Sequence, residues 1–220
     1  MRPLSRRGVL GLGACFAAGS VIGARLGLPS LWAARPIRPV SGDAIELVDR
    51  CFAGLDRAKI WDSHVHLVGT GAGGTGCWVN PALKSVLSPV KRLRYDVFRA
   101  ASGVTDDDRA DEQYLERLLM LHRAANPSGK LVMMAFDYRV GEDGAEQPDR
   151  SDFFTPNDYV LSVAKQNPDV VACASVHPYR ADAVDRLAPA VVEGGRAVKW
   201  LPNSMGIDPV APRCDAFYKK

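Results

Sequence analysis

The stretch Lys59-Ile60-Trp61-Asp62-Ser63-His64-Val65-His66-Leu67-Val68 decides the fold of this chain, because it is the first of four short, largely apolar runs. Its β-branched and aromatic residues, ended by glycines from Gly69 onward, are typical of a β-strand. Polar residues interrupt it at alternate positions. Since side chains alternate across a strand, we expect Asp62, His64 and His66 to share one face, with the two histidines about 7 Å apart at the backbone.

Three further apolar runs predict strands, and the segments between them predict helices. The expected strands are Leu131–Phe136, Val170–Val176 and Ala197–Leu201. Helices are expected at residues 41–57, 112–125, 156–167, 181–193 and 214–220, with a long loop between the first strand and the second helix. Ser41 or Asp43 is the expected cap of the first helix, and Thr155 that of the third.

Strands and helices alternate, which is the βαβ pattern of a parallel sheet. The pattern fits a (β/α)8 TIM-type barrel or an open doubly wound sheet, and periodicity alone leaves both open. Residues 60–220 supply only about the first four βα units, whereas a complete barrel needs roughly 250 residues. Four strands leave two open edges. We therefore expect the rest of the barrel to lie beyond Lys220 or on another polypeptide.

The composition is that of a globular protein, with 47% hydrophobic and 24% charged residues among 220. The net charge of +3 comes from the first 34 residues, which hold four arginines and no acid, while the remainder has 24 basic and 25 acidic residues. No basic stripe interleaved with aromatics is present, so we expect no nucleic-acid partner. The five cysteines, without a C-x-x-C pair, are interpreted as small buried hydrophobes or one disulfide.

Residues 1–34 are predicted to be a targeting leader, and residues 35–220 the barrel portion. Ser5-Arg6-Arg7-Gly8-Val9-Leu10 precedes an apolar run that Arg25 interrupts, and it resembles a twin-arginine export signal. The run is short for a membrane span. We expect export by the twin-arginine route to the periplasm, with an uncleaved anchor on the outer side of the inner membrane as the alternative. Membrane contact is expected only through the leader.

The histidine pair indicates metal chemistry. On an inward-facing strand both imidazoles reach one cation, and imidazole nitrogen binds zinc at about 2.0–2.1 Å. Asp62 is a candidate to accept a hydrogen bond from a ligating imidazole and so to orient it. Two histidines satisfied by other hydrogen bonds near a strand end are the alternative.

The D-x-H-x-H motif at Asp62–His66 resembles the amidohydrolase superfamily, in particular its amidohydrolase-related branch. The resemblance extends through Gly69–Pro81 and Ala197–Pro202 and covers residues of about 60–220. It implies a (β/α)8 barrel in which a divalent metal, expected to be zinc, activates water for attack on a C–N or C–O bond of a small molecule. Some members decarboxylate a small carboxylic acid instead. By this match His64 and His66 are metal ligands, and the family's later histidine and aspartate ligands have no counterpart here.

Three further residues are candidate catalytic residues. Lys199 lies in the fourth expected strand, where family members with two metals carry a carbamylated lysine; a carboxylate or substrate partner is the alternative. His177 and Asp137 follow the third and second strands, at the end of the strands where barrel catalysis takes place. A structural role at the strand end is the alternative for both. His122, inside an amphipathic helix, is interpreted as structural.

Other functions fit parts of the sequence. An H-x-H motif also opens phosphoesterase barrels of the polymerase-and-histidinol-phosphatase type and TatD-type nucleases, although an export signal and a near-neutral body disfavour a nuclease. Gly69–Gly74 matches G-x-G-x-x-G, but the preceding strand is polar and Cys77–Pro81 follows instead of a helix, which disfavours dinucleotide binding. A truncated inactive or partner-binding half-barrel is the third alternative. The sequence indicates neither substrate nor oligomeric state.

Overall fold

The computed structural model describes residues 41–124 and 129–220. The leader expected at residues 1–34 lies outside the described residues. The described chain belongs to two compact units, one made of residues 80–105 and the other of the remaining segments. The larger unit holds every candidate site residue, and the two units are described separately.

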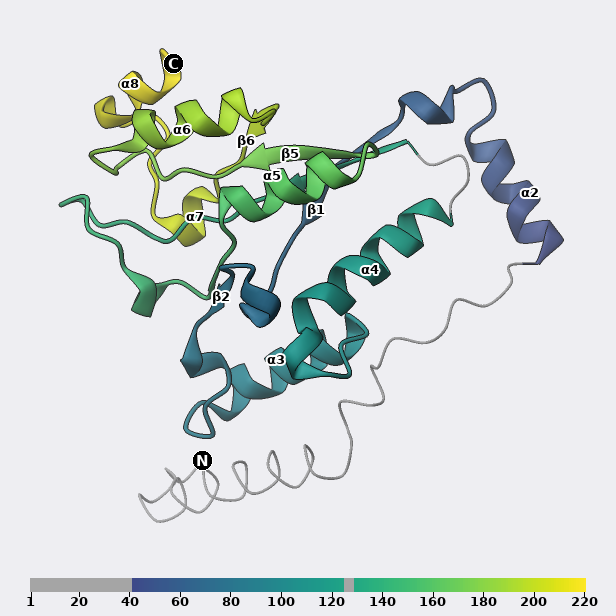
Figure 1. The fold of residues 1–220 in the computed structure, drawn as a ribbon, viewed down its shortest axis with the longest axis horizontal. Helices are drawn as coiled ribbons and strands as arrows, with labels where there is room; N and C mark the ends of the chain where they lie inside the picture. Colours follow the sequence, from purple (N-terminus) through teal and green to yellow (C-terminus); the bar gives the residue numbers. More distant parts are fainter. Residues whose placement is uncertain (1–40, 125–128) are drawn as a thin grey trace, which may run out of the picture. The chain divides into compact units, whose positions relative to one another are not determined.

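A curled sheet of four parallel strands forms the centre of the larger unit (Figure 1). In spatial order the strands are β1 (Trp61–His66), β3 (Lys130–Met134), β5 (Val170–Ala174) and β6 (Ala197–Val198). Each strand pairs with the next parallel strand along the chain, whereas a doubly wound sheet reverses its order. The four predicted strands and the mixed α/β class are confirmed, although each strand ends earlier than its apolar run.

Helices alternate with these strands. In the larger unit they are α2 (Gly42–Cys51), α4 (Ala110–Arg123), α5 (Asn157–Gln166), α6 (Ala183–Val192), α7 (Pro202–Met205) and α8 (Asp215–Tyr218). Short 3-10 turns lie at Arg57–Lys59, Ala72–Gly74, Asp107–Arg109, Pro148–Arg150 and Pro212–Cys214. Ser41 is the cap of α2, because its hydroxyl accepts a hydrogen bond from the Ala44 N–H at 3.3 Å. The five predicted helices are therefore present; α4 starts and ends two residues earlier than predicted, and the other four have shorter bounds.

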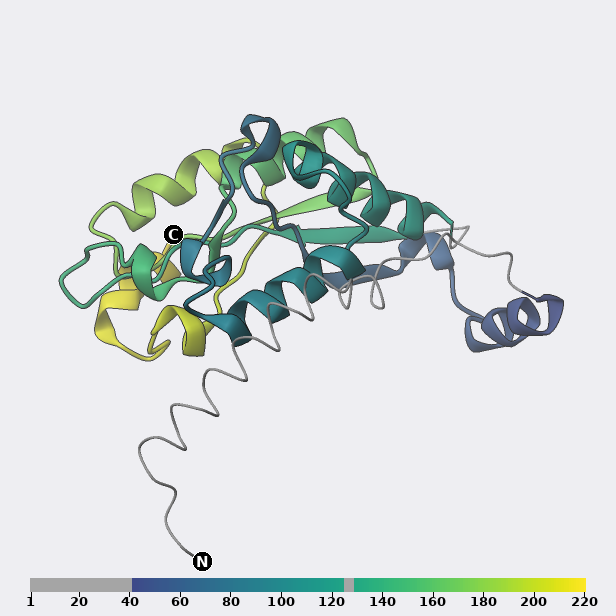
Figure 2. The same ribbon diagram turned by 90° about the horizontal axis from the view of Figure 1, so that it is seen from below.

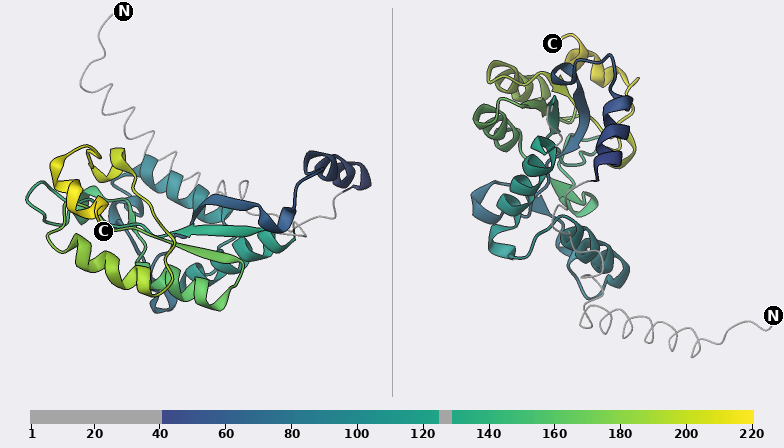
Figure 3. Two further views of the ribbon diagram at one scale, coloured as in Figure 1. Left: turned by 90° about the horizontal axis from the view of Figure 1, so that it is seen from above. Right: turned by 90° about the vertical axis from the view of Figure 1, so that its right-hand side faces the viewer.

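Helices α4, α5 and α6 pack on one face of the sheet (Figure 2), and Figure 3 shows α5 and α6 there from the opposite side. Leu119, Val160 and Ala190 from these helices join a cluster with Met133 of β3 and with Leu67, which directly follows β1; Leu67 and Met133 are completely buried. The opposite face carries a second buried cluster of Val132, Met134, Val171 and Cys173. Burial on both faces explains why β3 and β5 appear in the sequence as continuous apolar runs.

A small antiparallel ribbon lies beyond the carboxyl end of β3. Its strands are β2 (Trp78–Val79) and β4 (Phe153–Phe154), and Trp78 pairs with Phe154. Tyr138, just after β3, stacks on Phe154 with ring centroids 4.3 Å apart, and Phe136 packs on Phe153 at 4.5 Å. The sequence predicts neither strand, because two-residue strands are too short to show an alternating pattern.

The smaller unit contains a helix that the sequence analysis misses. The prediction of a long loop between the first strand and the second helix is wrong, because helix α3 spans Pro89–Ala101 and a 3-10 turn spans Pro81–Leu83. Proline occupies the first turn of α3, where no backbone donor is lost. Val90, Leu93 and Val97 stand at helical spacing and are the signal that predicts it.

Thr155 is not the cap of α5, so that prediction is wrong. Pro156 occupies the cap position without a side-chain hydrogen bond. The Thr155 hydroxyl instead donates to the Leu67 carbonyl at 2.7 Å, and the Thr155 backbone pairs with Phe136. The Thr155 hydroxyl is therefore used in a long-range hydrogen bond and is not available to cap α5. Local sequence spacing does not reveal such a long-range bond.

The cysteines are free in the described chain. Cys77, Cys173 and Cys214 are buried, which confirms their interpretation as small hydrophobes. Cys51, on α2, is exposed, so that interpretation is wrong for this residue.

Candidate metal centre

The imidazoles of His64 and His66 converge near the carboxyl end of β1. Their Nε2 atoms are 2.8 Å apart and their ring centroids 4.9 Å apart, so one ring donates its Nε2 proton to the other. The register of β1 against β3 shifts by one residue between Asp62 and Val65. An extra residue of this kind bends a strand and re-aims its side chains, which places His64 opposite no regular partner.

The pair fits a divalent metal as two neighbouring ligands. Two nitrogens that bind one tetrahedral zinc at about 2.0–2.1 Å stand about 3.3 Å apart. The 2.8 Å between the two Nε2 atoms is close to this separation. In the segments that the structure describes, no group of three or more His, Cys, Asp and Glu side chains is placed to hold a metal.

Asp62 contacts the backbone of this strand. Its Oδ1 accepts a hydrogen bond from the His64 N–H at 3.1 Å. Asp62 pairs with Leu131 of β3, whereas His66 pairs with Met134, and these partners belong to the clusters on opposite faces of the sheet. The prediction that Asp62 shares a face with His66 is therefore wrong, because the register shifts between them; the Asp62 carboxylate has the His64 backbone as its partner.

His66 is half-buried between aromatic rings and a positive charge. The His66 ring stacks on the Phe136 ring, and the two ring centroids are 5.1 Å apart. Burial lowers the pKa of His66, and the nearby His64 and Lys199 lower it further. A depressed pKa keeps the imidazole neutral near pH 7, and the neutral ring is the form that binds a metal.

Lys199 lies close to the histidine pair. It directly follows β6, and its N–H donates to the Ala174 carbonyl at 2.8 Å, which extends the ladder by one bond. Its positive charge lowers the pKa of His66. Burial raises the thiol pKa of Cys173 to about 11, and the charge of Lys199 reduces this rise. Cys173 and Met134, the β3 partner of His66, belong to the buried cluster on the sheet face opposite α4, α5 and α6, and the charge of Lys199 acts on this side.

His177 and Asp137 belong to a different, fully bonded network. The His177 ring is completely buried; its Nε2 faces the Met205 carbonyl at 3.0 Å and its Nδ1 accepts from the Tyr179 N–H at 3.2 Å. Both ring nitrogens are thus engaged. Asp137 accepts from the His177 N–H at 2.7 Å and pairs with Arg180 at 2.6 Å. The structure brings these two candidates together, and it groups neither with the histidine pair.

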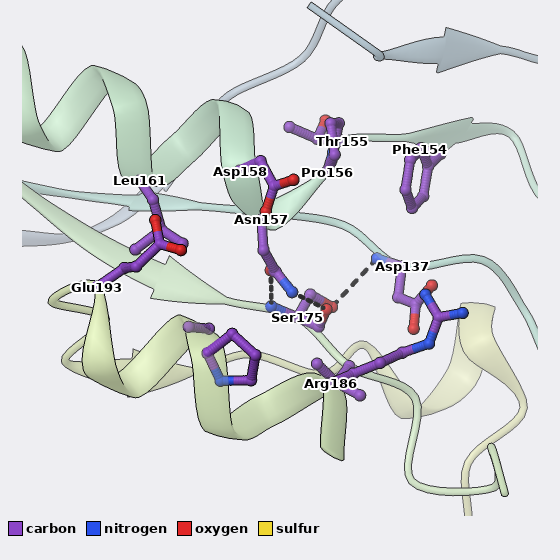
Figure 4. Close-up of a pocket in the computed structure, with 13 residues that line it drawn as sticks. Asp137, Phe154, Thr155, Pro156, Asn157, Asp158, Leu161, Ser175, Arg186 and Glu193 are labelled. Atoms are coloured by element: carbon purple, nitrogen blue, oxygen red, sulfur yellow. Dashed lines mark hydrogen bonds between the residues drawn. The ribbon is translucent and has the colours of Figure 1, made fainter. Parts of the chain in front are cut away.

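A cavity of about 270 Å³ lies between α5 and α6, at the carboxyl ends of β3 and β5 (Figure 4). Asn157 crosses its floor, where its amide group makes two hydrogen bonds to the backbone of Ser175, at 2.8 and 3.2 Å. Asp158, Arg186 and Glu193 line the mouth. The walls come from the helix-covered face, whereas His66 lies on the other face, so this cavity is separate from the histidine pair.

Asp111 is the buried polar residue that the sequence analysis misses. It is completely buried near the start of α4 and accepts hydrogen bonds from Thr70, Gly71 and Thr75 in the loop after β1. Acidic residues are common in the first turn of a helix, and Glu112 shares this turn with Asp111, so the sequence offers no distinctive signal. The segment that matches G-x-G-x-x-G therefore includes the 3-10 turn Ala72–Gly74 and is hydrogen-bonded to a buried carboxylate.

No protein-family model, no curated protein and no solved structure matches this chain. The resemblance carried by the D-x-H-x-H motif accordingly stays a prediction. Within residues 41–124 and 129–220, no helix is both long enough and apolar enough to span a membrane.

Proposed function

We propose that this chain is the first part of a (β/α)8 barrel hydrolase of the amidohydrolase-related type, which uses a divalent metal held by His64 and His66. The observation that carries the proposal is the convergence of the two Nε2 atoms to 2.8 Å near the carboxyl end of the first strand. The strand order β1-β3-β5-β6 supports it, because a barrel adds each parallel strand beside the previous one.

A bound divalent metal supplies a Lewis acid that polarises a scissile carbonyl and acidifies a water molecule. The chain's own residues prepare the place for it. Burial and the neighbouring charges keep His66 neutral, and a neutral ring with its proton on Nδ1 would offer Nε2 to a metal in place of the hydrogen bond to His64. Phe136 covers one side of the His66 ring and excludes water from it. Lys199 supplies a positive charge on the same face, suited to an anionic carboxylate or a developing oxyanion of the substrate.

The test begins with metal content. The purified chain, produced with its leader and without added chelator, is assayed for zinc, manganese and iron by mass spectrometry, and for hydrolysis of amides, lactones and phosphate esters and for decarboxylation. We expect bound zinc and turnover of an amide or lactone. The double variant His64→Ala with His66→Ala should lose the metal. His122→Gln, a histidine change on α4, is the matched control and should retain it. Equal metal content in both variants would refute the proposal.

A partner-binding half-barrel is the second candidate, and the edges of the described sheet favour it. β1 and β6 are its outer strands, and Trp61 on β1 and Val198 on β6 remain 51% and 41% exposed. Exposed strand edges pair readily with another chain. Light scattering with size-exclusion chromatography separates the two candidates: a stable complex without metal supports the half-barrel, and a metal-loaded monomer supports the hydrolase.

A further inference from the structure

The carboxyl end of β1 is held by side chains. β3 gives it one last ladder bond, from the Leu67 N–H to the Met134 carbonyl at 3.4 Å. The next two carbonyls accept from hydroxyls instead. Tyr114 donates to the His66 carbonyl at 2.7 Å, and Thr155 donates to the Leu67 carbonyl at 2.7 Å. The backbone of His66 is therefore fixed by a residue of α4.

The loop that follows β1 is fixed by the same helix. Asp111 accepts hydrogen bonds from the backbone N–H groups of Thr70 and Gly71, at 2.5 and 3.1 Å, and from the hydroxyls of Thr70 and Thr75, at 3.1 and 2.5 Å. Hydrogen bonds to an ionised acceptor are among the stronger ones in proteins, and a buried group that loses them is left with its full desolvation cost. The loop and α4 therefore form one rigid corner.

Asp111 and Tyr114 are three residues apart on α4, so they lie on one face of the helix, one turn from each other. We propose that Asp111 and Tyr114 are positioning residues that hold His64 and His66 in their metal-binding arrangement. Tyr114 binds the backbone carbonyl of His66, which is one of the two proposed ligands. Asp111 fixes the loop that follows β1, so that the position of the strand end does not vary with that loop. This inference rests on the proposed function, because the arrangement that it explains is that of a metal site.

The chemistry of both contacts suits a fixed support. The Tyr114 hydroxyl donates to the His66 carbonyl at 2.7 Å, and the Asp111 carboxylate accepts four hydrogen bonds from the loop. Groups that orient a ligand from behind commonly change metal affinity by about 10- to 100-fold when they are removed. A residue with a purely structural role would instead lower stability and leave the geometry of the two rings unchanged.

Three variants of the full chain test the inference. Tyr114→Phe removes only the hydroxyl, and Asp111→Asn removes the charge while keeping the shape. Tyr218→Phe is the matched control, because the Tyr218 hydroxyl donates to the Pro209 carbonyl at the same 2.7 Å, on α8. Zinc affinity is measured by calorimetric titration of the metal-free protein, and ligand geometry by the visible absorption spectrum of the cobalt-substituted protein.

We expect Tyr114→Phe and Asp111→Asn to weaken zinc binding about tenfold or more and to shift the cobalt spectrum. Tyr218→Phe should match the wild-type protein in both measurements. Unchanged affinity and spectrum in folded Tyr114→Phe and Asp111→Asn proteins would overturn the positioning role. Folding is checked by cooperative thermal melting of each variant.

A metal-free measurement separates failure of this inference from failure of the proposed function. Nitrogen-15 NMR of the histidine rings reports the Nε2–Nε2 hydrogen bond between His64 and His66 directly. Wild-type protein that binds no zinc would refute the proposed function. The positioning role is then decided by the ring spectra: Tyr114→Phe should shift the signals of both rings and Tyr218→Phe neither, and unshifted signals in Tyr114→Phe would overturn it.

Discussion

Arg180 holds the carboxylate of Asp137 with two hydrogen bonds, from Nε to Oδ2 at 2.7 Å and from Nη2 to Oδ1 at 2.6 Å. The two side chains are only 5% and 7% exposed. A third nitrogen of Arg180 binds Glu146 at 2.6 Å, and although burial alone lowers the pKa of Arg180, these two carboxylates raise it overall. The Arg180–Asp137 pair joins the segment after β3 to the segment after β5. Asp137 and His177, which also bond to each other, therefore have a structural role at these strand ends.

Arg180→Ala should therefore unfold more easily than the wild-type protein. Removal of one partner leaves the Asp137 carboxylate buried and unpaired, which costs about 3–5 kcal/mol. Urea denaturation measures the loss. Arg186→Ala is the control, because the Arg186–Asp182 pair is 53% and 51% exposed, and such pairs contribute under about 1 kcal/mol. Equal losses in the two variants would contradict the importance of the buried pair.

The stability of the fold should decrease as pH falls below 6.5, and His177 should be one cause. Burial lowers the pKa of His177 below its ordinary 6.5, so the unfolded chain binds a proton that the folded chain excludes. The contribution of neutral His177 to the free energy of unfolding is complete above pH 6.5. It is lost as the pH falls from 6.5 toward the pKa of His177 in the folded protein. In His177→Asn the amide oxygen replaces Nδ1 as acceptor for the Tyr179 N–H.

Denaturation at several pH values between 7.5 and 5.5 measures this effect. The wild-type free energy of unfolding should fall more steeply than that of His177→Asn, by up to about 1.4 kcal/mol per pH unit. His66 has a lowered pKa as well, so part of the slope should remain in the variant. Parallel slopes would show that His177 does not titrate between the folded and unfolded states.

The sequence predicts the sheet well because β3 and β5, at its centre, are buried on both faces and therefore apolar, whereas β1 and β6 at its edges are largely exposed. The same property explains why strand ends are predicted too late: Phe136 and Val176 are buried, but they lie in the loops. The convergence of His64 and His66 follows from their alternate spacing, whereas the shifted register beside them depends on pairing with β3. The spacing of residues along one strand does not reveal how that strand pairs with its neighbour.

Long-range hydrogen bonds account for the site features that the sequence does not predict. Thr155 has the local context of a helix cap, yet its hydroxyl binds a carbonyl 88 residues away. Asp111 has the context of an exposed first-turn acid, yet it is completely buried against a loop about 40 residues earlier. The Asp111 contact forms only once the loop after β1 packs on α4, and the Thr155 contact only once Leu67 lies beside the segment before α5, so local propensity points to the wrong partner.

Thr155→Val should destabilise the protein although it preserves the shape of the side chain. The variant leaves the buried Leu67 carbonyl without its hydroxyl donor, which costs about 1–3 kcal/mol. Thr155→Ser keeps the hydroxyl and loses only a methyl group, so it is the matched control and should lose less. If the serine variant is the less stable of the two in urea denaturation, packing of the methyl group outweighs the hydrogen bond.

Gly69→Ala should be destabilising because of Asp111. A Cβ atom at Gly69 would overlap the Asp111 carboxylate, which four hydrogen bonds hold in place. Either the carboxylate moves and loses bonds to the loop, or the loop moves away from α4. Overpacking of this kind typically costs about 1–3 kcal/mol. Gly42→Ala on α2 is the control, since a Cβ there has no neighbour within 4 Å.

A double-mutant cycle identifies the partner in this overlap. In the Asp111→Ala background the carboxylate is absent, so adding the methyl group at Gly69 should cost much less than it does in the wild-type protein. Residues in direct contact show coupling energies of about 0.5–3 kcal/mol, and distant residues add independently. Additive losses for Gly69→Ala and Asp111→Ala would mean that the methyl group meets a different obstacle, and that the loop after β1 does not depend on the carboxylate for its position.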